Sequence, residues 1–416
     1  EKNAVTIDGL RLEYPPVGTW AESLVCIGPG ANFSSKTAKL LPTAKAKPEG
    51  LLWSTLETGR PGSGMTVGSF YPTVFIGGDR RGFLWWGDND KGWFPDDAVP
   101  AHDLVRQGDT VVFRNHIIGK PVELDRPRTI AFSYIATPFK PMWDSWRAVG
   151  ATEDGTFVVP HRGVRKDSKT GKMVNPQRRQ NNIIHPESRY PEEWAALWAQ
   201  QKTEGFARYR SAEATEAARI LSDPYAARNG IEWGHMSFTL SGYGTISLER
   251  HLFNYFGSEW ETGGQRPWNK SVIDYAMYLY HRAFGEGGVH SLYFDITFPT
   301  PFKDPLTGLC YELPDGRIQK GYNGWNQRRF YMRLYALADE HGLNPFCTGS
   351  HSTNAYVTVA MPWLDAVLDG ERNWNLDVTD LDWVDYYPVE RMRSMSSPHT
   401  WGVPICWMAN MDTDDK

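Results

Sequence analysis

The second half of the sequence alternates short apolar segments with segments of helical periodicity, and this order limits the fold more than any other feature. Apolar runs of strand length recur between helical runs, several of which end at glycine. Strands that alternate with helices form parallel β/α units, and about 275 residues of such a pattern suit a (β/α)8 barrel. The predicted strands are 231–240, 289–298, 343–350, 364–371 and 403–409, and the predicted helices are 191–201, 269–288 and 326–342.

Acidic side chains stand where two of these strands end. In "SLYFDITFPTPF" the apolar run reaches Asp295, and the prolines that follow prevent the strand from continuing. In "VLDGE" the strand residues are followed by Asp369 and Glu371. Active sites of (β/α)8 barrels lie at the carboxyl ends of the strands, so we expect these acids to meet at one barrel mouth. Other residues expected there are His235, Tyr243 and His351.

The first 140 residues follow a different pattern. The runs "TVFIGG", "RGFLWWGD", "DTVVFRNHII" and "RTIAFSYIAT" are β-branched or aromatic and are separated by Gly, Pro and Asp turns. Short strands at such spacing are typical of an antiparallel β-sandwich. The proline-bounded "ATPFKPM" predicts a boundary, with a sandwich in 1–140 and a barrel in 141–416. The acidic end "MDTDDK" is interpreted as a solvated tail or as a truncation before further C-terminal domains.

Charge, hydropathy and motifs exclude several classes of function. The net charge is -5 and no basic stripe is present, which argues against a nucleic-acid partner. No apolar run reaches the length of a membrane span, and the P-loop, dinucleotide and G-x-S-x-G motifs are absent, so we expect no cofactor. Asp88 and Asp90 only partly match a calcium loop, because Gly92 occupies a ligand position, so we expect no metal.

Paired carboxylates at one barrel mouth can cleave a glycosidic bond. One acid protonates the departing oxygen, while the other attacks the anomeric carbon or activates water. Asp295 is short and close to its strand, which suits the nucleophile or charge stabiliser. Glu371 lies further from its strand end, which suits the acid, and Asp369 is the rival for either role. We expect retention of configuration, because acids near their strand ends lie close together.

Aromatic residues are abundant, with 18 Trp, 19 Tyr and 19 Phe. Most of these rings are expected to fill the core, but their apolar faces also suit the C–H faces of sugars. Glu259 and Trp260 in "FGSEW" suit hydrogen bonding and stacking with a sugar, and Trp325 and Trp374 are further candidate platforms. The expected partner is therefore a carbohydrate.

Several motifs together resemble a known group of proteins: "GGDRRGFLWWGDNDKGW", "ATPFKP", "FGSEW", "LYFDITFPTPFKDPLTGLCY", "GYNGWNQRRFYMRLY" and "LDAVLDGE". They resemble bacterial glycoside hydrolase-like domains related to glycoside hydrolase family 123, over about residues 70–410. The resemblance implies a β-sandwich followed by a (β/α)8 barrel, and the breakdown of polysaccharides or glycans. In that family an adjacent Asp-Glu pair acts on N-acetylgalactosamine, whereas Gly370 separates Asp369 from Glu371 here. The "LYFD" strand end is also similar to that of retaining α-galactosidase-type barrels.

The sequence therefore predicts a glycoside hydrolase acting on a polysaccharide or glycan, with a galactose or N-acetylgalactosamine type of sugar favoured. We expect it to be secreted or periplasmic, with its signal peptide not present in this chain. Two alternatives stay open at this point. One is a non-catalytic carbohydrate-binding protein on a hydrolase scaffold, and the other is a polysaccharide lyase that uses Tyr243 or His351 as its base.

Overall fold

The computed structural model describes two regions of the chain and several short segments. The described residues are 4–17, 20–27, 36–58, 65–142, 150–151, 157–158, 165–166, 173–174, 268–287, 291–294, 301–303, 305–343, 346–351, 359–369 and 389–407. The four pairs between 150 and 174 are the two-residue strands β12 to β15, which form two antiparallel ribbons.

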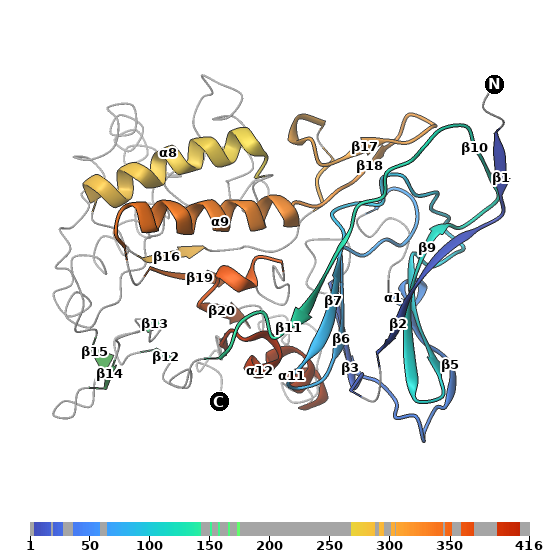
Figure 1. The fold of residues 1–416 in the computed structure, drawn as a ribbon, viewed down its shortest axis with the longest axis horizontal. Helices are drawn as coiled ribbons and strands as arrows, with labels where there is room; N and C mark the ends of the chain where they lie inside the picture. Colours follow the sequence, from blue (N-terminus) through green and yellow to red (C-terminus); the bar gives the residue numbers. More distant parts are fainter. Residues whose placement is uncertain are drawn as a thin grey trace, which may run out of the picture.

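The N-terminal region is built from antiparallel sheets (Figure 1). One sheet has five strands in the order β11-β7-β6-β3-β4, and the other has four in the order β2-β9-β8-β5. A two-stranded ribbon pairs β1 with β10. The strands are β1 Val5–Ile7, β2 Leu10–Val17, β3 Ser23–Ile27, β4 Lys36–Leu40, β5 Glu49–Ser54, β6 Thr73–Gly77, β7 Gly82–Trp86, β8 His102–Gln107, β9 Thr110–Ile118, β10 Val122–Leu124 and β11 Ser133–Thr137, with the short helix α1 at Thr55–Thr58.

Strand β6 shows how the sandwich joins the rest of the molecule. All five of its residues are buried. Val74 and Ile76 belong to the core of the sandwich, together with Trp53 and Trp85, whereas Phe75 belongs to a second core that continues into the C-terminal region. Successive side chains of a strand point to opposite faces, so both faces of this sheet are covered and the strand is apolar throughout.

The C-terminal region contains a four-stranded parallel sheet in the order β16-β19-β20-β21. Helices α8 and α9 pack together and lie over the side of this sheet near β16 and β19 (Figure 1). The elements are α8 Lys270–Gly287, β16 Ser291–Phe294, the ribbon strands β17 Tyr311–Glu312 and β18 Ile318–Gln319, α9 Gly324–Glu340, β19 Cys347–His351, β20 Ala366–Asp369, α11 Val389–Ser396, α12 Pro398–Trp401 and β21 Ile405–Trp407.

Close contacts fix the two regions against each other. The ring centroids of Phe75 in β6 and Trp401 in α12 are 4.6 Å apart. Gly324 begins α9 directly against the Trp86 ring, and a Cβ atom there would overlap the indole. Gly402 has φ +78° and faces the backbone carbonyl of Lys140, so both its conformation and its packing require glycine.

The predicted elements that lie among the described residues are confirmed. The runs in 73–137 form β6, β7, β9 and β11, the helical patterns form α8 and α9, and the four later apolar runs form parallel strands. The boundary at residue 140 and the closure into an eight-stranded barrel stay predictions, because most of 143–267 lies outside the described residues. Within the described part, no helix combines the length and apolarity needed to cross a bilayer.

Candidate active site at the carboxyl edge of the parallel sheet

The parallel sheet brings three of the predicted strand ends to one edge. β16 ends at Phe294, immediately before Asp295 in the sequence, while β19 ends at His351 and β20 ends at Asp369. All three strands run in the same direction. In open α/β sheets, ligands bind outside the carboxyl ends of such strands.

The strand register shows how closely the backbone brings these positions together. Phe294 pairs with Ser350, and His351 pairs with Leu368. Asp369 therefore lies one position beyond the partner of His351 on the neighbouring strand, and it pairs in turn with Trp407 of β21. A histidine, an aspartate and a tryptophan thus end three adjacent strands.

Trp407 is not among the site residues that the sequence predicts. The run "VPICWMA" predicts a strand, but a tryptophan inside an apolar run reads equally well as a core residue. Its pairing with Asp369 becomes visible only from the register.

The opposite end of the sheet is held by a buried carboxylate. Asp365, just before β20, accepts hydrogen bonds from the Thr348 N–H at 2.9 Å and from the Tyr335 hydroxyl at 2.8 Å. The ammonium group of Lys140 lies 3.4 Å from the same carboxylate. Protein donors surround this acid, so it ties β19, β20, α9 and the chain leaving the sandwich together, which is a structural role.

Trp325 lies in the first turn of α9, against the sandwich. Its indole N–H donates to Ser133 Oγ in β11 at 2.7 Å, and its backbone N–H donates to the Asp88 carboxylate at 3.1 Å. The side chain is only partly buried. Its polar atom is therefore engaged with the sandwich, and the role of its ring face as a sugar platform stays a prediction.

The remaining predicted site residues are outside the described part of the chain. The backbones of His351 and Asp369 are described but their side-chain environments are not. The residues outside the described ranges are Asp295, Glu371, His235, Tyr243, Glu259, Trp260 and Trp374. Their proposed roles stay predictions.

Asp88 and Asp90, considered above as a partial calcium loop, are buried where the sandwich meets the segment 311–325. The Trp86 indole N–H donates to Asp88 at 2.6 Å, and Asp90 accepts hydrogen bonds from the Tyr311 hydroxyl at 2.8 Å and from Gln319 Nε2 at 2.9 Å. The protein's own donors thus occupy these oxygens. Among the described residues, no group of three or more His, Cys, Asp or Glu side chains is arranged to hold a metal ion.

Burial raises the pKa of both carboxylates. The pKa of Asp88 rises to about 7 because of desolvation, which the hydrogen bonds from Trp86 and from the start of α9 only partly oppose. The pKa of Asp90 rises to about 6 for the same reason, partly opposed by the hydrogen bonds from Gln319 and Tyr311. These two acids change their protonation near neutral pH at the junction between the regions.

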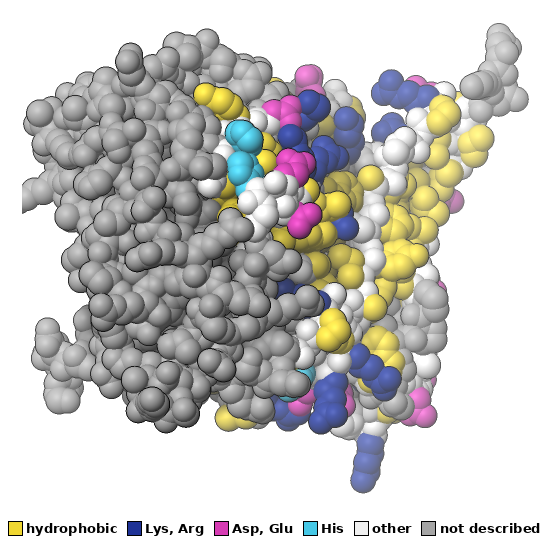
Figure 2. Space-filling view, turned by 60° about the vertical axis from the view of Figure 1, so that its left-hand side comes forward, with side chains coloured by type: hydrophobic (Ala, Val, Ile, Leu, Met, Phe, Trp, Pro, Cys, Tyr) yellow, Lys and Arg dark blue, Asp and Glu magenta, His cyan; other side chains and the backbone are white. Residues whose placement is uncertain are grey.

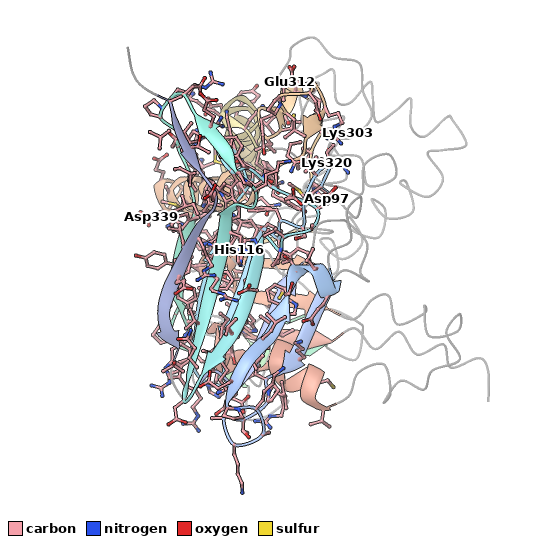
Figure 3. All side chains as sticks on the ribbon, turned by 90° about the vertical axis from the view of Figure 1, so that its right-hand side faces the viewer. Asp97, His116, Lys303, Glu312, Lys320 and Asp339 are labelled. Carbon is pink, nitrogen blue, oxygen red and sulfur yellow. The ribbon has the colours of Figure 1, made fainter. Side chains whose placement is uncertain are left out.

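A row of charged side chains lies on the outside of this junction. Figure 3 shows Glu312, Lys303, Lys320 and Asp97 following one another along the side of the β17–β18 ribbon. The pKa of Lys320 is lowered by partial burial and by the charge of Lys303. This row belongs to the junction and not to the carboxyl edge of the parallel sheet.

The comparisons with known proteins show only low similarity between this chain and the solved structures named below. No protein-family model and no curated protein matches it. The GalNAc complex of NagBb, an α-N-acetylgalactosaminidase from Bifidobacterium bifidum, aligns at 11% identity with a TM-score of 0.20, over 96% of this chain and 67% of that chain. A quadruple mutant of the same protein aligns at 13% identity with a TM-score of 0.18, over 88% and 60% of the two chains.

The chain thus spans between three-fifths and about two-thirds of the length of these solved structures. At such TM-scores the likeness does not establish a shared fold, and the identity is too low to transfer an activity.

Proposed function

We propose that this protein is a glycoside hydrolase whose active site lies at the carboxyl edge of the β16-β19-β20-β21 sheet. The observation that carries the proposal is the register of parallel strands that end next to Asp295, at His351 and at Asp369. The carboxyl ends of parallel strands are the usual location of catalytic groups in α/β enzymes. A (β/α)8 barrel that contains this sheet is part of the proposal.

The proposed chemistry uses two carboxylates in different protonation states. Asp295 is the nucleophile or charge stabiliser and stays ionised, while Glu371 is the acid that protonates the leaving oxygen, with Asp369 in reserve. A neighbouring carboxylate disfavours a second negative charge, which keeps the acid protonated. Retention of configuration requires the two carboxyl groups to lie about 5–5.5 Å apart.

The proposed substrate is a polysaccharide or glycan with galactose or N-acetylgalactosamine units, met by a secreted or periplasmic enzyme. Support for a sugar comes from the abundance of aromatic residues in the chain, whose apolar ring faces suit the C–H faces of sugars. Trp260, Trp325 and Trp374 are the candidate platforms, and His235, Tyr243, Glu259 and His351 are the candidate hydrogen-bonding residues.

The test is a screen of glycans and aryl glycosides against the wild-type protein and Asp295→Asn. The proposal expects release of reducing sugar from at least one substrate by the wild-type protein and none by the variant. Binding of a glycan without any cleavage would instead indicate a non-catalytic carbohydrate-binding protein. An unsaturated product from a uronate polymer would indicate a lyase, and either outcome would overturn the proposal.

A further inference from the structure

Two histidines meet across the α8–α9 pair, far along the helices from the junction with the sandwich. His281 Nδ1 in α8 and His341 Nε2 at the end of α9 are 2.9 Å apart. Figure 2 shows adjoining histidine side chains at the surface, next to acidic side chains. His281 is exposed and His341 is partly buried, so the pair lies at the surface of the described part of the chain.

The backbone and the packing hold the His341 ring in place. His341 caps α9, and its N–H donates to the Leu337 carbonyl. Gly342, with φ +66°, then closes the helix with an N–H bond to the Asp339 carbonyl, as is common for a C-terminal glycine. The His341 ring packs edge-on against the ring of Phe284, with the two ring centroids 5.8 Å apart. Phe284 is buried and lies one turn after His281 on α8.

We propose that His281 and His341 form a surface site for a divalent transition metal, with two imidazole ligands and the remaining positions filled by water. This inference is independent of the proposed hydrolase activity. In the metal-free pair the two nitrogens face each other in a hydrogen bond, and a turn of the exposed His281 ring would direct both of them at one ion. At the same nitrogen–nitrogen distance of 2.9 Å, two metal–nitrogen bonds of about 2.0–2.1 Å enclose an angle of about 90°. That angle suits octahedral or tetragonal coordination, the geometry of Ni²⁺ and Cu²⁺, better than the tetrahedral geometry of structural zinc.

The protonation of the pair is compatible with metal binding. One ring nitrogen donates a proton to the other in the metal-free pair, and this proton moves to the second nitrogen of its own ring when the metal binds. Two neutral imidazoles are then the ligands.

The test uses the full chain without a polyhistidine tag. Titration calorimetry with NiCl₂ is compared among the wild-type protein, His281→Ala, His341→Ala and His399→Ala, which replaces an exposed histidine on α12. The proposal expects the first two variants to bind at least about 10-fold more weakly and His399→Ala to bind like the wild type. Equal Ni²⁺ binding by all four proteins would overturn it.

A second measurement guards against a folding defect in His341→Ala, because this ring packs on Phe284. Electron paramagnetic resonance with one equivalent of Cu²⁺ should show two imidazole nitrogens in the wild-type protein and one in His281→Gln, which changes only an exposed side chain. A copper spectrum that is unchanged in His281→Gln would contradict the site even if His341→Ala fails to fold.

Discussion

Acidic side chains occupy two very different regions of this molecule, the junction between the sandwich and the C-terminal region and the carboxyl edge of the parallel sheet. At the junction, Asp88 and Asp90 are buried and accept hydrogen bonds from Trp86, Gln319 and Tyr311. At the sheet edge, strands end in sequence next to Asp295 and at Asp369. An acid whose oxygens accept hydrogen bonds from buried protein groups has a structural role. The acids at the strand ends are the ones that we propose for chemistry, because catalytic groups of α/β enzymes lie at such positions.

The comparison implies opposite consequences of substitution in the two regions. Replacing a junction acid should lower stability, because buried donors lose their acceptor. Replacing an edge acid should lower turnover and leave stability nearly unchanged.

The largest effect on stability is expected from Asp88→Ala. This change leaves the Trp86 indole N–H and the Trp325 N–H without their acceptor in a buried site, and each buried unsatisfied donor costs about 1–3 kcal/mol. We expect the free energy of unfolding to fall by about 3 kcal/mol, measured by urea denaturation. Asp88→Asn is the matched control, because its amide oxygen still accepts a hydrogen bond. We expect its free energy of unfolding to fall less than that of Asp88→Ala. A loss below about 1 kcal/mol for Asp88→Ala would show that the junction does not depend on this carboxylate.

The pH dependence of stability should reveal the same carboxylate. The pKa of Asp88 is about 7 in the folded protein and about 3.9 in an unfolded chain. Between these values the folded state holds a proton that the unfolded state has released. The contribution of Asp88 to the free energy of unfolding is therefore fully present below pH 4. It is lost as the pH rises toward 7, by up to about 1.4 kcal/mol per pH unit.

The measurement is the free energy of unfolding at pH 5, 6, 7 and 8 for the wild-type protein and Asp88→Asn. Other carboxylates contribute equally to both proteins, so the difference between the two curves isolates Asp88. We expect the wild-type protein to lose stability relative to the variant as the pH rises. Parallel curves would contradict the raised pKa.

The smallest effect on the free energy of unfolding is expected from a substitution on the exposed face of α8. Lys270 forms an exposed ion pair with Asp274 at 2.7 Å, four residues along the helix, and Arg333 also pairs with Asp274. Exposed ion pairs between residues four apart on a helix contribute about 0.3–0.5 kcal/mol to the free energy of unfolding. Lys270→Ala should therefore change the free energy of unfolding by no more than about 0.5 kcal/mol. A loss as large as that of Asp88→Ala would remove the distinction between exposed and buried charges on which the comparison depends.

Local sequence patterns were sufficient to predict several of the strands and the two long helices but not the junction. Strands such as β6 and β7 follow from their β-branched and aromatic residues, and α8 and α9 follow from their periodicity and terminal glycines. The partners of Asp88 and Asp90 were not predictable, because Trp325 and Gln319 are more than 200 residues away in the sequence. The sequence shows only a partial match to a calcium loop, from which no metal was expected, and it gives no sign of the hydrogen bonds that Asp88 and Asp90 accept across the junction.

Strand β2 illustrates a second limit. Pro15 and Pro16 argue against a strand, since proline cannot donate a ladder hydrogen bond. In the structure they fall between Tyr14 and Val17, where the register of β2 against β9 shifts. β2 is also an edge strand, and an irregular edge strand tolerates prolines that a central strand would not. Sequence could not distinguish these cases without knowledge of the strand order.

The candidate site was predictable only in part. The positions of Asp369 and His351 at strand ends follow from "VLD" and "FCTGSH", and the strand register adds Trp407 as a further neighbour of Asp369. Trp325 was predicted from its position before a helix, but its N–H groups contact Ser133 and Asp88 of the sandwich. Which region a tryptophan at the start of a helix contacts depends on long-range packing, which has no local signature.

Asp295 and Glu371 are proposed to act on a glycosidic bond in unequal roles, and the most direct test of these roles is kinetic. Turnover and melting temperature would be measured for the wild-type protein, Asp295→Asn and Glu371→Gln on a natural glycan and on an aryl glycoside with an acidic leaving group. We expect Asp295→Asn to lose turnover on both substrates, and Glu371→Gln to lose it on the natural glycan while sparing the aryl glycoside, which needs little protonation. Melting temperatures should stay close to that of the wild-type protein. Equal losses of Glu371→Gln on both substrates would contradict the assigned roles, and full activity of Asp295→Asn would contradict the site itself.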